Sequence, residues 1–489
     1  MNHSDNLDGE KTGGTSARSL PIDNAEYDAV VPLDPKVEKK LLRRIDGFTI
    51  SILGALYLMS FLDRGNIGAA NVATPSISQA TGLSPEQYGA VVSVVYATYV
   101  VCEPIWANLL KILSPKIVLS GTTLVWGGLT LGTAWAKNYQ HLMAIRVLLG
   151  VFEAGVFPCI TVYVLMNYRR EEAGRRMSYI FSCAAFAGAV GGLIGFGLVR
   201  IETGDTVGWQ YLYIVEGCLS LILAPIAYFW VPNRMDKAWF LNAKQREQAM
   251  VRYQVNKADY NEEEQFAWAE VKKALLAWPV YAAGTIQFCA DITLYGISTF
   301  MPQIIRAMGF SNVNAQLLTV PVYVWGASVF MFVAWFSDKY RMRSPFIVLG
   351  LSLNLLGYIL LATIESVAGR YTALYVISAG IYITPGLNVT WIGGNTRGHF
   401  KRSTAVGLNQ LIGNSAGAAI GTIYLSTLAP RYLQSMYISM GLTAVGIVTA
   451  VVLGLHFKRQ NGIKRQLVAE GAPDQPELGD HNPHFQYMI

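Results

Sequence analysis

Seven ionisable residues lie inside long apolar stretches of this chain. They are Asp63, Arg64, Glu103, Arg146, Glu153, Glu216 and Asp291. A charge at the centre of a lipid bilayer costs about 2.5–3.5 kcal/mol on insertion scales, so such residues are candidates for function. No histidine lies in the middle of these stretches, so we do not expect a proton relay built on imidazole.

Four of these residues are placed to form one charged cluster. Asp63 and Arg64 are adjacent near the end of the first stretch, and Arg146 and Glu153 are seven residues apart in the fourth. Seven residues are about two turns of a helix, so the latter two share a face. An incoming carboxylate that takes over an arginine would free an acid to bind a proton. The alternative is a purely structural cluster.

The other three acids suggest different roles. Glu103 lies toward the inner end of the second stretch and is a candidate for gating, whereas we interpret Glu216 as structural. Asp291 has Gln287 and Tyr295 one turn to either side, so the three form a polar stripe on one helix face. That stripe faces either a cavity or a neighbouring helix, and the sequence leaves both open.

Amide side chains in the second half could supply hydrogen bonds to a substrate. We single out Gln287, Asn388 and Asn414, with Asn395 and Asn409 nearby. A lone polar residue in a membrane helix often forms only an interhelical hydrogen bond, worth about 0.6 kcal/mol. Structural bonding is therefore the alternative for each of them.

The elements that position these residues are membrane-spanning helices. Of the 489 residues, 52% are hydrophobic and 14% are charged, against roughly 25% charged in soluble domains. A span needs about 20 mostly apolar residues, and such runs number about twelve. They lie at 47–66, 86–110, 116–136, 140–165, 177–199, 209–231, 275–300, 315–337, 345–365, 371–394, 403–427 and 433–457. The sequence therefore predicts an all-α polytopic membrane protein.

Lysine and arginine give these spans an orientation. The loops on one side hold most of the basic residues, and the other side has only Lys137, Arg200, Arg306, Arg370 and Arg431. The positive-inside rule then predicts that both termini are cytoplasmic. We expect the protein to lie in the plasma membrane. The same asymmetry explains the net charge of +6 without a nucleic-acid partner.

The chain divides into two groups of six spans. We predict a disordered cytoplasmic tail at 1–45, a six-helix bundle at 46–231, a charged cytoplasmic loop at 232–274, a second bundle at 275–457 and a loose cytoplasmic tail at 458–489. Glycines spaced for close helix packing recur in the fifth and eleventh spans, which supports a two-fold internal repeat.

The sequence offers no catalytic or metal-binding motif. The five cysteines all lie in spans without metal-ligand spacing, and we interpret them as packing residues. Phosphate-loop, zinc-protease and serine-hydrolase patterns are missing from the sequence. We therefore expect no cofactor, no metal and no enzymatic activity, and an ion gradient as the energy source.

Several segments resemble the major facilitator superfamily. The loop from Phe336 to Arg343 (FSDKYRMR) is similar to that superfamily's aspartate-then-basic loop, whereas 104–111 departs from the usual pattern. Three segments are similar to the fungal allantoate and nicotinate permease-like branch of the anion:cation symporter family. They are the unusual loop 104–111, Phe61–Gly68 (FLDRGNIG) and Arg146–Gly155 (RVLLGVFEAG).

This resemblance implies roles for individual residues. In related proton-coupled sugar-acid transporters, the residues that match Asp63 and Glu153 are proton sites, and those that match Arg64 and Arg146 bind the substrate anion. The loop with Asp338, Arg341 and Arg343, together with Glu103, is implied to latch the two halves. The resemblance predicts a monomer in the lipid bilayer whose partners are a small organic anion and a proton.

The resulting prediction is a proton-coupled symporter that works by alternating access. A vitamin carboxylate, a ureide and a sugar acid all fit the paired arginines. Export of a fungal secondary metabolite is the main alternative, and a sensor without transport is another. The fifth span lacks the Gly-Pro-x-x-Gly-Gly pattern associated with drug/proton antiporters, which favours uptake.

Overall fold

The computed structural model describes residues 33–489 apart from 169, 200, 202–205, 260–267 and 429–430. All regular elements among these residues are helices. Within the described residues, eight helical stretches, two of them made of two consecutive helices, are long and apolar enough to cross a membrane. This confirms the predicted all-α membrane fold.

The first half of the chain forms one bundle. Its helices are α1 (Pro35–Ala70), α3 (Pro85–Ile112), α4 (Pro115–Thr133), α5 (Tyr139–Glu153), α6 (Val156–Asn167), α7 (Arg170–Leu198) and α8 (Gly208–Trp230). The helices α5 and α6 are two pieces of one bent span, so these elements make six spans. The short α2 (Ile77–Ala80) lies in the connection between α1 and α3.

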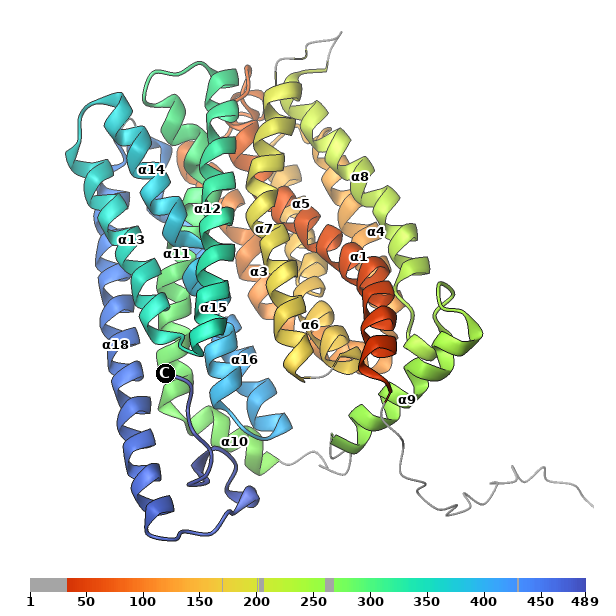
Figure 1. Ribbon diagram of the computed structural model, residues 1–489. Coiled ribbons are helices and arrows are strands. Elements are labelled where there is room, and N and C mark those ends of the chain that lie inside the picture. The colour runs from red at the N-terminus through yellow and green to blue at the C-terminus, as the bar shows by residue number, and fades with distance from the viewer. Residues whose placement is uncertain (1–32, 169, 200, 202–205, 260–267, 429–430) are drawn as a thin grey trace, which may run out of the picture.

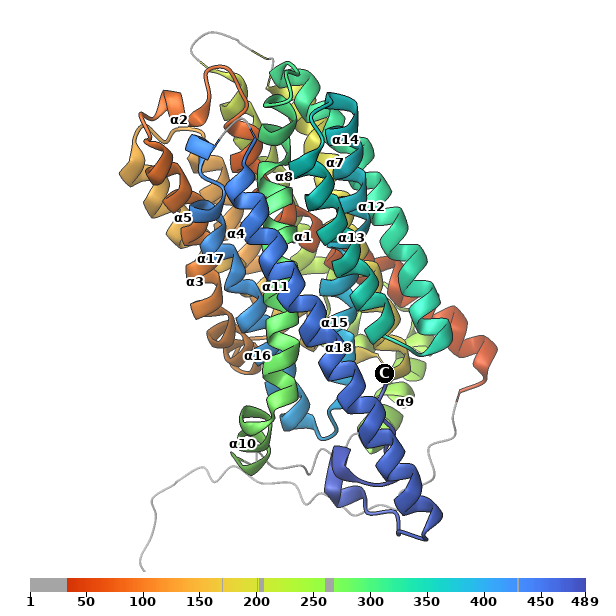
Figure 2. The same ribbon diagram turned by 90° about the vertical axis from the view of Figure 1, so that its left-hand side faces the viewer.

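The second half repeats this arrangement. Its helices are α11 (Trp278–Arg306), α12 (Asn312–Tyr340), α13 (Ser344–Thr363), α14 (Val367–Ile381), α15 (Ile383–Asn395), α16 (His399–Asn414), α17 (Ala416–Ile423) and α18 (Leu433–Ala469). Here α14 with α15, and α16 with α17, are bent spans, which again gives six. Figures 1 and 2 show the two bundles side by side, with α9 (Ala243–Asp259) and α10 (Trp268–Leu276) at one end.

Local sequence explains where several helices begin. Ser84 accepts a hydrogen bond from the backbone of Gln87, whose side chain accepts one from the Ser84 backbone, and Pro85 occupies the first turn of α3. Asn138 and Ser311 cap α5 and α12 in a similar way through their side-chain oxygens. Such caps satisfy amide groups that have no partner within the helix.

The halves touch closely at the end of the bundle away from α9 and α10, which we call the distal end. A Cβ atom on Gly68 of α1 would lie 1.8 Å from the Thr299 carbonyl oxygen of α11, and one on Gly89 of α3 would lie 2.4 Å from the Gly421 carbonyl oxygen of α17. Only glycine allows backbones to approach so closely. The distal end is therefore closed in this structure.

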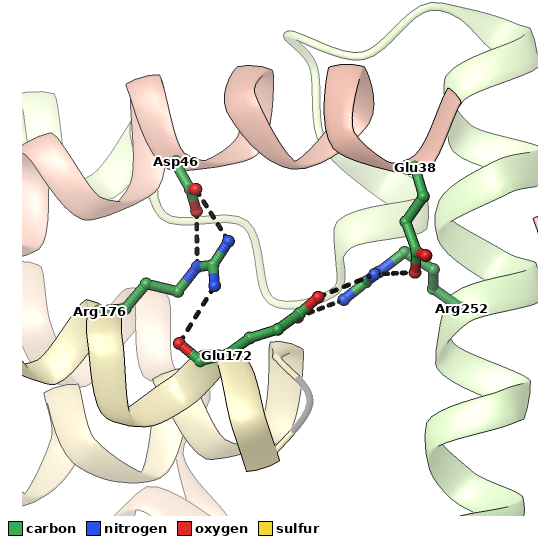
Figure 3. A network of polar contacts seen from close by, with 5 residues as sticks. All are labelled: Glu38, Asp46, Glu172, Arg176 and Arg252. Carbon is green, nitrogen blue, oxygen red and sulfur yellow. Dashed lines mark hydrogen bonds and ion pairs between the residues drawn. The ribbon is translucent and has the colours of Figure 1, made fainter. Parts of the chain in front are cut away.

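At the other end, the proximal end, two buried arginines and their partly exposed acidic partners join α1, α7 and α9 (Figure 3). Arg252 of α9 pairs with Glu38 of α1 and, at 2.6 Å, with Glu172 of α7. Arg176 of α7 makes two hydrogen bonds of 2.9 Å to Asp46 of α1. The predicted charged loop thus contains a helix that is fixed to α1 and α7 by ion pairs.

The predicted loose C-terminal tail differs from the structure. Helix α18 continues to Ala469, and the segment after it packs against the second bundle. The Asn395 and Asn461 side chains each exchange two hydrogen bonds with its backbone, at Met488 and Tyr487. The segment has no apolar period, so the sequence did not reveal these contacts. Likewise, α1 begins at Pro35, inside the predicted N-terminal tail.

Candidate functional site: a cavity between the two halves

A narrow cavity lies between the two bundles. The first half contributes Tyr57, Phe61, Arg64, Tyr99, Phe157 and Phe181, and the second half contributes Gln287, Asp291, Leu294, Tyr295, Pro385, Gln410 and Asn414. Its volume is about 30 Å³. That space suits a few waters, whereas sites for organic ligands span about 300–1,000 Å³. A substrate would therefore enter only after the halves move apart.

Helix α1 presents one face to this cavity. Tyr57, Phe61 and Arg64 line it, and their spacing of four and three residues places them on the same side of the helix. The Arg64 guanidinium lies 4.5 Å from the centre of the Tyr99 ring and 5.3 Å from that of Phe61. Aromatic faces at these distances stabilise a cation, so the rings hold the guanidinium in place.

The cation in the cavity wall is paired with an acid on another helix. Arg64 Nε donates to Glu153 Oε1 over 2.5 Å, and Ser60 Oγ donates to the same oxygen over 2.5 Å. Arg64 is 9% exposed and Glu153 is 3% exposed. Opposite charges this close lower the cost of burial for each other. Removing either partner would leave an uncompensated buried charge.

The second half faces Arg64 with amides and one carboxylate. On α11, Gln287 Nε2 donates to both Asp291 oxygens over 3.2 Å, and Tyr295 donates to Asn414 Oδ1 over 2.7 Å. Asn414 Nδ2 in turn donates to Glu103 Oε2 of α3 over 3.1 Å. The last contact joins α16 of the second bundle to α3 of the first.

Two predicted substrate ligands lie behind the cavity wall. Asn388 of α15 donates to Gln287 Oε1 over 3.0 Å and is fully buried. Arg146 of α5 donates to the Tyr213 hydroxyl of α8 over 2.8 Å, and its Nε has no partner. Both residues support their neighbours in this state. They remain predicted ligands for a state in which the cavity is wider.

The seven-residue spacing of Arg146 and Glu153 does not produce a pair between them. Glu153, the last residue of α5, bonds to Arg64 and Ser60 of α1. Asp63, the other predicted proton site, points to a different interface: its Oδ1 accepts from Asn66, and its Oδ2 has no hydrogen-bond donor. The two predicted proton sites therefore sit in different surroundings.

The predicted gating loop lies at the proximal end, between α12 and α13. Arg343 Nη2 pairs with Asp338 Oδ1 over 2.5 Å, and Arg343 Nη1 donates to Ser337. Arg341 ends α12 in a left-handed backbone conformation, with a φ of 52°. The loop is thus bound within the second half in this structure.

Sequence reasoning missed the aromatic wall of the cavity. Tyr57, Tyr99, Phe157 and Phe181 are ordinary residues for a membrane span, and their type alone points to packing. The helical spacing of Tyr57 and Phe61 to Arg64 was the available signal. The site combines one cation, Arg64, one carboxyl group, Asp291, hydrogen-bonding amides and flat apolar surfaces.

The site also lacks the features of some other chemistries. Within the described parts of the chain, no group of three or more His, Cys, Asp or Glu side chains is placed to hold a metal ion. All five cysteines occur as free thiols. The ionisable groups that line the cavity are the guanidinium of Arg64, the carboxyl group of Asp291 and the hydroxyls of Tyr57, Tyr99 and Tyr295.

Comparisons with known proteins agree with this geometry. Residues 56–422 match the family model described as Major Facilitator Superfamily. The chain is similar to the high-affinity nicotinic acid transporter of Saccharomyces cerevisiae, with 36% identity over 98% of this chain and 90% of the relative. An uncharacterized transporter of Schizosaccharomyces pombe is 39% identical over 94% of this chain and 92% of the relative.

Solved structures share the fold at low sequence identity. The partially occluded inward-open xylose transporter XylE from E. coli has a TM-score of 0.65 and 14% identity, over 84% of this chain and 97% of that one. A bacterial homologue of the human lysosomal transporter Spinster, in an inward-facing unoccupied conformation, has a TM-score of 0.64 and 16% identity, over 84% of this chain and 96% of that one.

Proposed function

This chain belongs to the Major Facilitator Superfamily, and on that premise we propose that it is a secondary active transporter that carries a small organic anion together with protons. The observation that carries the proposal is Arg64, a cation in the cavity wall whose partner is the carboxylate of Glu153 at 2.5 Å. A substrate carboxylate can replace that partner, and the displaced acid can then accept a proton.

The proposed cycle follows from charge balance in a buried site. In the empty carrier, Glu153 neutralises Arg64. When a substrate carboxylate binds the guanidinium through two parallel hydrogen bonds, Glu153 loses its counter-charge and becomes costly to keep ionised at this depth. Protonation of Glu153 removes that cost. The charges of Arg64 and the substrate carboxylate then cancel, and Glu153 is neutral. The two halves can close around the bound substrate.

The walls of the cavity favour a flat organic anion. Tyr57, Tyr99, Phe157 and Phe181 offer ring surfaces, while Gln287 and Asn414 offer amide hydrogen bonds. A vitamin carboxylate with an aromatic ring uses both kinds of surface. The likeness to a nicotinic acid transporter supports the same class. A ureide or a sugar acid would use the amides and Arg64 but gain less from the rings.

Transport would proceed by alternating access between the bundles. The close glycine contacts at the distal end would open, and contacts at the proximal end would form, while the substrate stays near Arg64. The bond between Asn414 and Glu103 crosses the halves, which supports a gating role for Glu103. Separation of the bundles also supplies the volume that the closed cavity lacks.

The proposed orientation places the proximal end in the cytoplasm of a plasma-membrane monomer. It is supported by the basic residues that concentrate in the proximal loops. A tag at either terminus or in 232–274 should be labelled only after the cells are permeabilised. Labelling of intact cells at any of these three positions would overturn the orientation.

An uptake screen tests the substrate class. Cells that lack their own organic-acid permeases would express the chain and receive labelled nicotinate, a sugar acid or allantoate at acidic and neutral outside pH. We expect uptake of at least one anion that rises at acidic pH. Efflux of preloaded compounds without any uptake would instead support export, and binding without flux would support a sensor.

A further inference from the structure

A second pair of carboxyl groups lies between α1 and α8, apart from the pair of Arg64 and Glu153. Asp63 of α1 is 5% exposed, and Glu216 of α8 is fully buried. Asn66 of α1 stands between them. Its Nδ2 donates to Asp63 Oδ1 over 3.4 Å and also to Glu216 Oε2. One amide thus holds an oxygen of each acid.

The other two oxygens have no donor. Asp63 Oδ2 and Glu216 Oε1 are both buried without a hydrogen-bond partner, and the shared Asn66 amide holds the two carboxyl groups close together. An ionised carboxylate only accepts hydrogen bonds, whereas a protonated one also donates. Two ionised groups held by one amide would leave both oxygens unsatisfied and close to a like charge. A single proton between them supplies the missing donor.

No ion pair relieves this repulsion, although the charge of Arg146 acts on Asp63. Among the ion pairs of the described residues, none includes Asp63 or Glu216. Arg64 is engaged by Glu153, and Arg146 points to the Tyr213 hydroxyl. Two carboxylates that share a buried site without a paired cation cannot both ionise at moderate cost. The pair therefore titrates as one unit rather than as two independent acids.

We propose that Asp63 and Glu216 form one proton-binding site, with Asn66 as its clamp, and that the pair holds a single shared proton in this state of the protein. Glu216 thereby acquires a role that its sequence context did not suggest. The existence of the site is independent of the substrate; its use as a second coupling site rests on the proposed function.

The surroundings of the pair connect it to the cavity. The other charged groups that act on Asp63 are Glu153 and Arg146 of α5, and α4 adds the hydroxyl of Thr130. From α8, Tyr213 adds its hydroxyl one turn before Glu216. Helix α7 packs against both α1 and α8 and has no Asp, Glu, Lys, Arg or His in 177–198. A change in the charge of Glu153 therefore changes the proton affinity of the Asp63 and Glu216 pair. In this way substrate binding at Arg64 can alter that affinity.

Infrared difference spectroscopy of the purified, membrane-reconstituted full chain tests the proposal without a substrate. A protonated carboxylic acid has a carbonyl-stretch band that shifts in deuterated water. We expect Asp63→Asn and Glu216→Gln each to lose the same band at neutral pH, because the new amide donates to the remaining acid and allows it to ionise. The double variant should lose no more than either single variant. Glu365→Gln, at an 86% exposed side chain, is the control and should lose nothing.

The outcomes separate this site from the proposed function. If neither single variant loses a band, both acids are ionised in the parent. If the two variants lose different bands and the double variant loses both, the acids carry two separate protons. Either result overturns the shared site. If one variant does not fold, a pH titration of the band lost in the other still counts its protons. Failure to find an anion substrate leaves these spectra unaffected. Conversely, anion uptake that keeps its full proton dependence in Glu216→Gln would remove the pair from coupling.

Discussion

Replacing Arg64 with glutamine tests the anion site most simply. The change removes the charge from the cavity wall and ends the 2.5 Å pair with Glu153. It keeps an amide that can still bond to Ser60 or Glu153. We expect the variant to reach the membrane, because Glu153 at 3% exposure can take up a proton when it loses its counter-charge.

The size of the effect follows from the contacts that a carboxylate would make. A hydrogen bond to a charged group contributes about 1.5–3 kcal/mol, and each 1.4 kcal/mol is about tenfold in affinity. The KM for an anionic substrate should therefore rise by about 10- to 150-fold in Arg64→Gln. Arg64→Lys keeps the charge but lacks the planar fork and the stacking on Tyr99, which lies 4.5 Å away. It should recover only a small part of the loss.

The assay is the initial rate of labelled anion uptake at fixed outside pH, normalised to protein at the cell surface. Arg431→Gln is the matched control, because that arginine is 38% exposed and only loosely paired with Glu365, at 3.6 Å. Its exposed pair contributes little, so its KM should stay within about twofold. Normal KM and rate in Arg64→Gln, at full surface level, would refute the anion-binding role of Arg64.

Two further predictions concern the ends of the bundle. Gly68→Ala should prevent closure of the distal end, because its Cβ would lie 1.8 Å from the Thr299 carbonyl oxygen. Probes that reach the cavity from that end should label this variant more than the parent, whereas Gly47→Ala, with open space around it, should be labelled like the parent. Unchanged labelling of Gly68→Ala would contradict the closed contact. Arg252→Gln should lower the free energy of unfolding by about 1–3 kcal/mol because it leaves Glu172 without its buried cation. A double-mutant cycle with Glu172→Gln measures the coupling energy of the pair. Additive effects would show that the pair does not stabilise the protein.

The spans were predictable because membrane insertion depends on local composition. A run of about 20 apolar residues is visible in one dimension, and the positions of such runs agree with the helices. The breaks inside spans do not show in hydropathy, but proline marks two of them. Pro158 and Pro385 are the third residues of α6 and α15, and each lacks the amide that would bond to the carbonyl four residues before it.

The ionisable residues of the site were found for the same reason, but their partners were not. A charge inside an apolar span stands out whatever its neighbours are. Which charge meets which depends on helix rotation and depth, and the structure pairs Glu153 with Arg64 across two helices rather than with Arg146 along its own helix. Glu216 was interpreted as structural because nothing in its own span reveals Asp63 and Asn66 opposite it.

The coupling role of Glu153 is tested most directly by Glu153→Gln in reconstituted vesicles, where accumulation against a gradient and exchange of labelled for unlabelled anion are measured side by side at two outside pH values. Glutamine imitates the protonated acid permanently and leaves Arg64 free to bind a carboxylate. The account predicts that exchange continues, that accumulation driven by a proton gradient stops, and that the rise of flux at acidic outside pH disappears. Accumulation by Glu153→Gln in response to a proton gradient would contradict it and place the coupling site elsewhere.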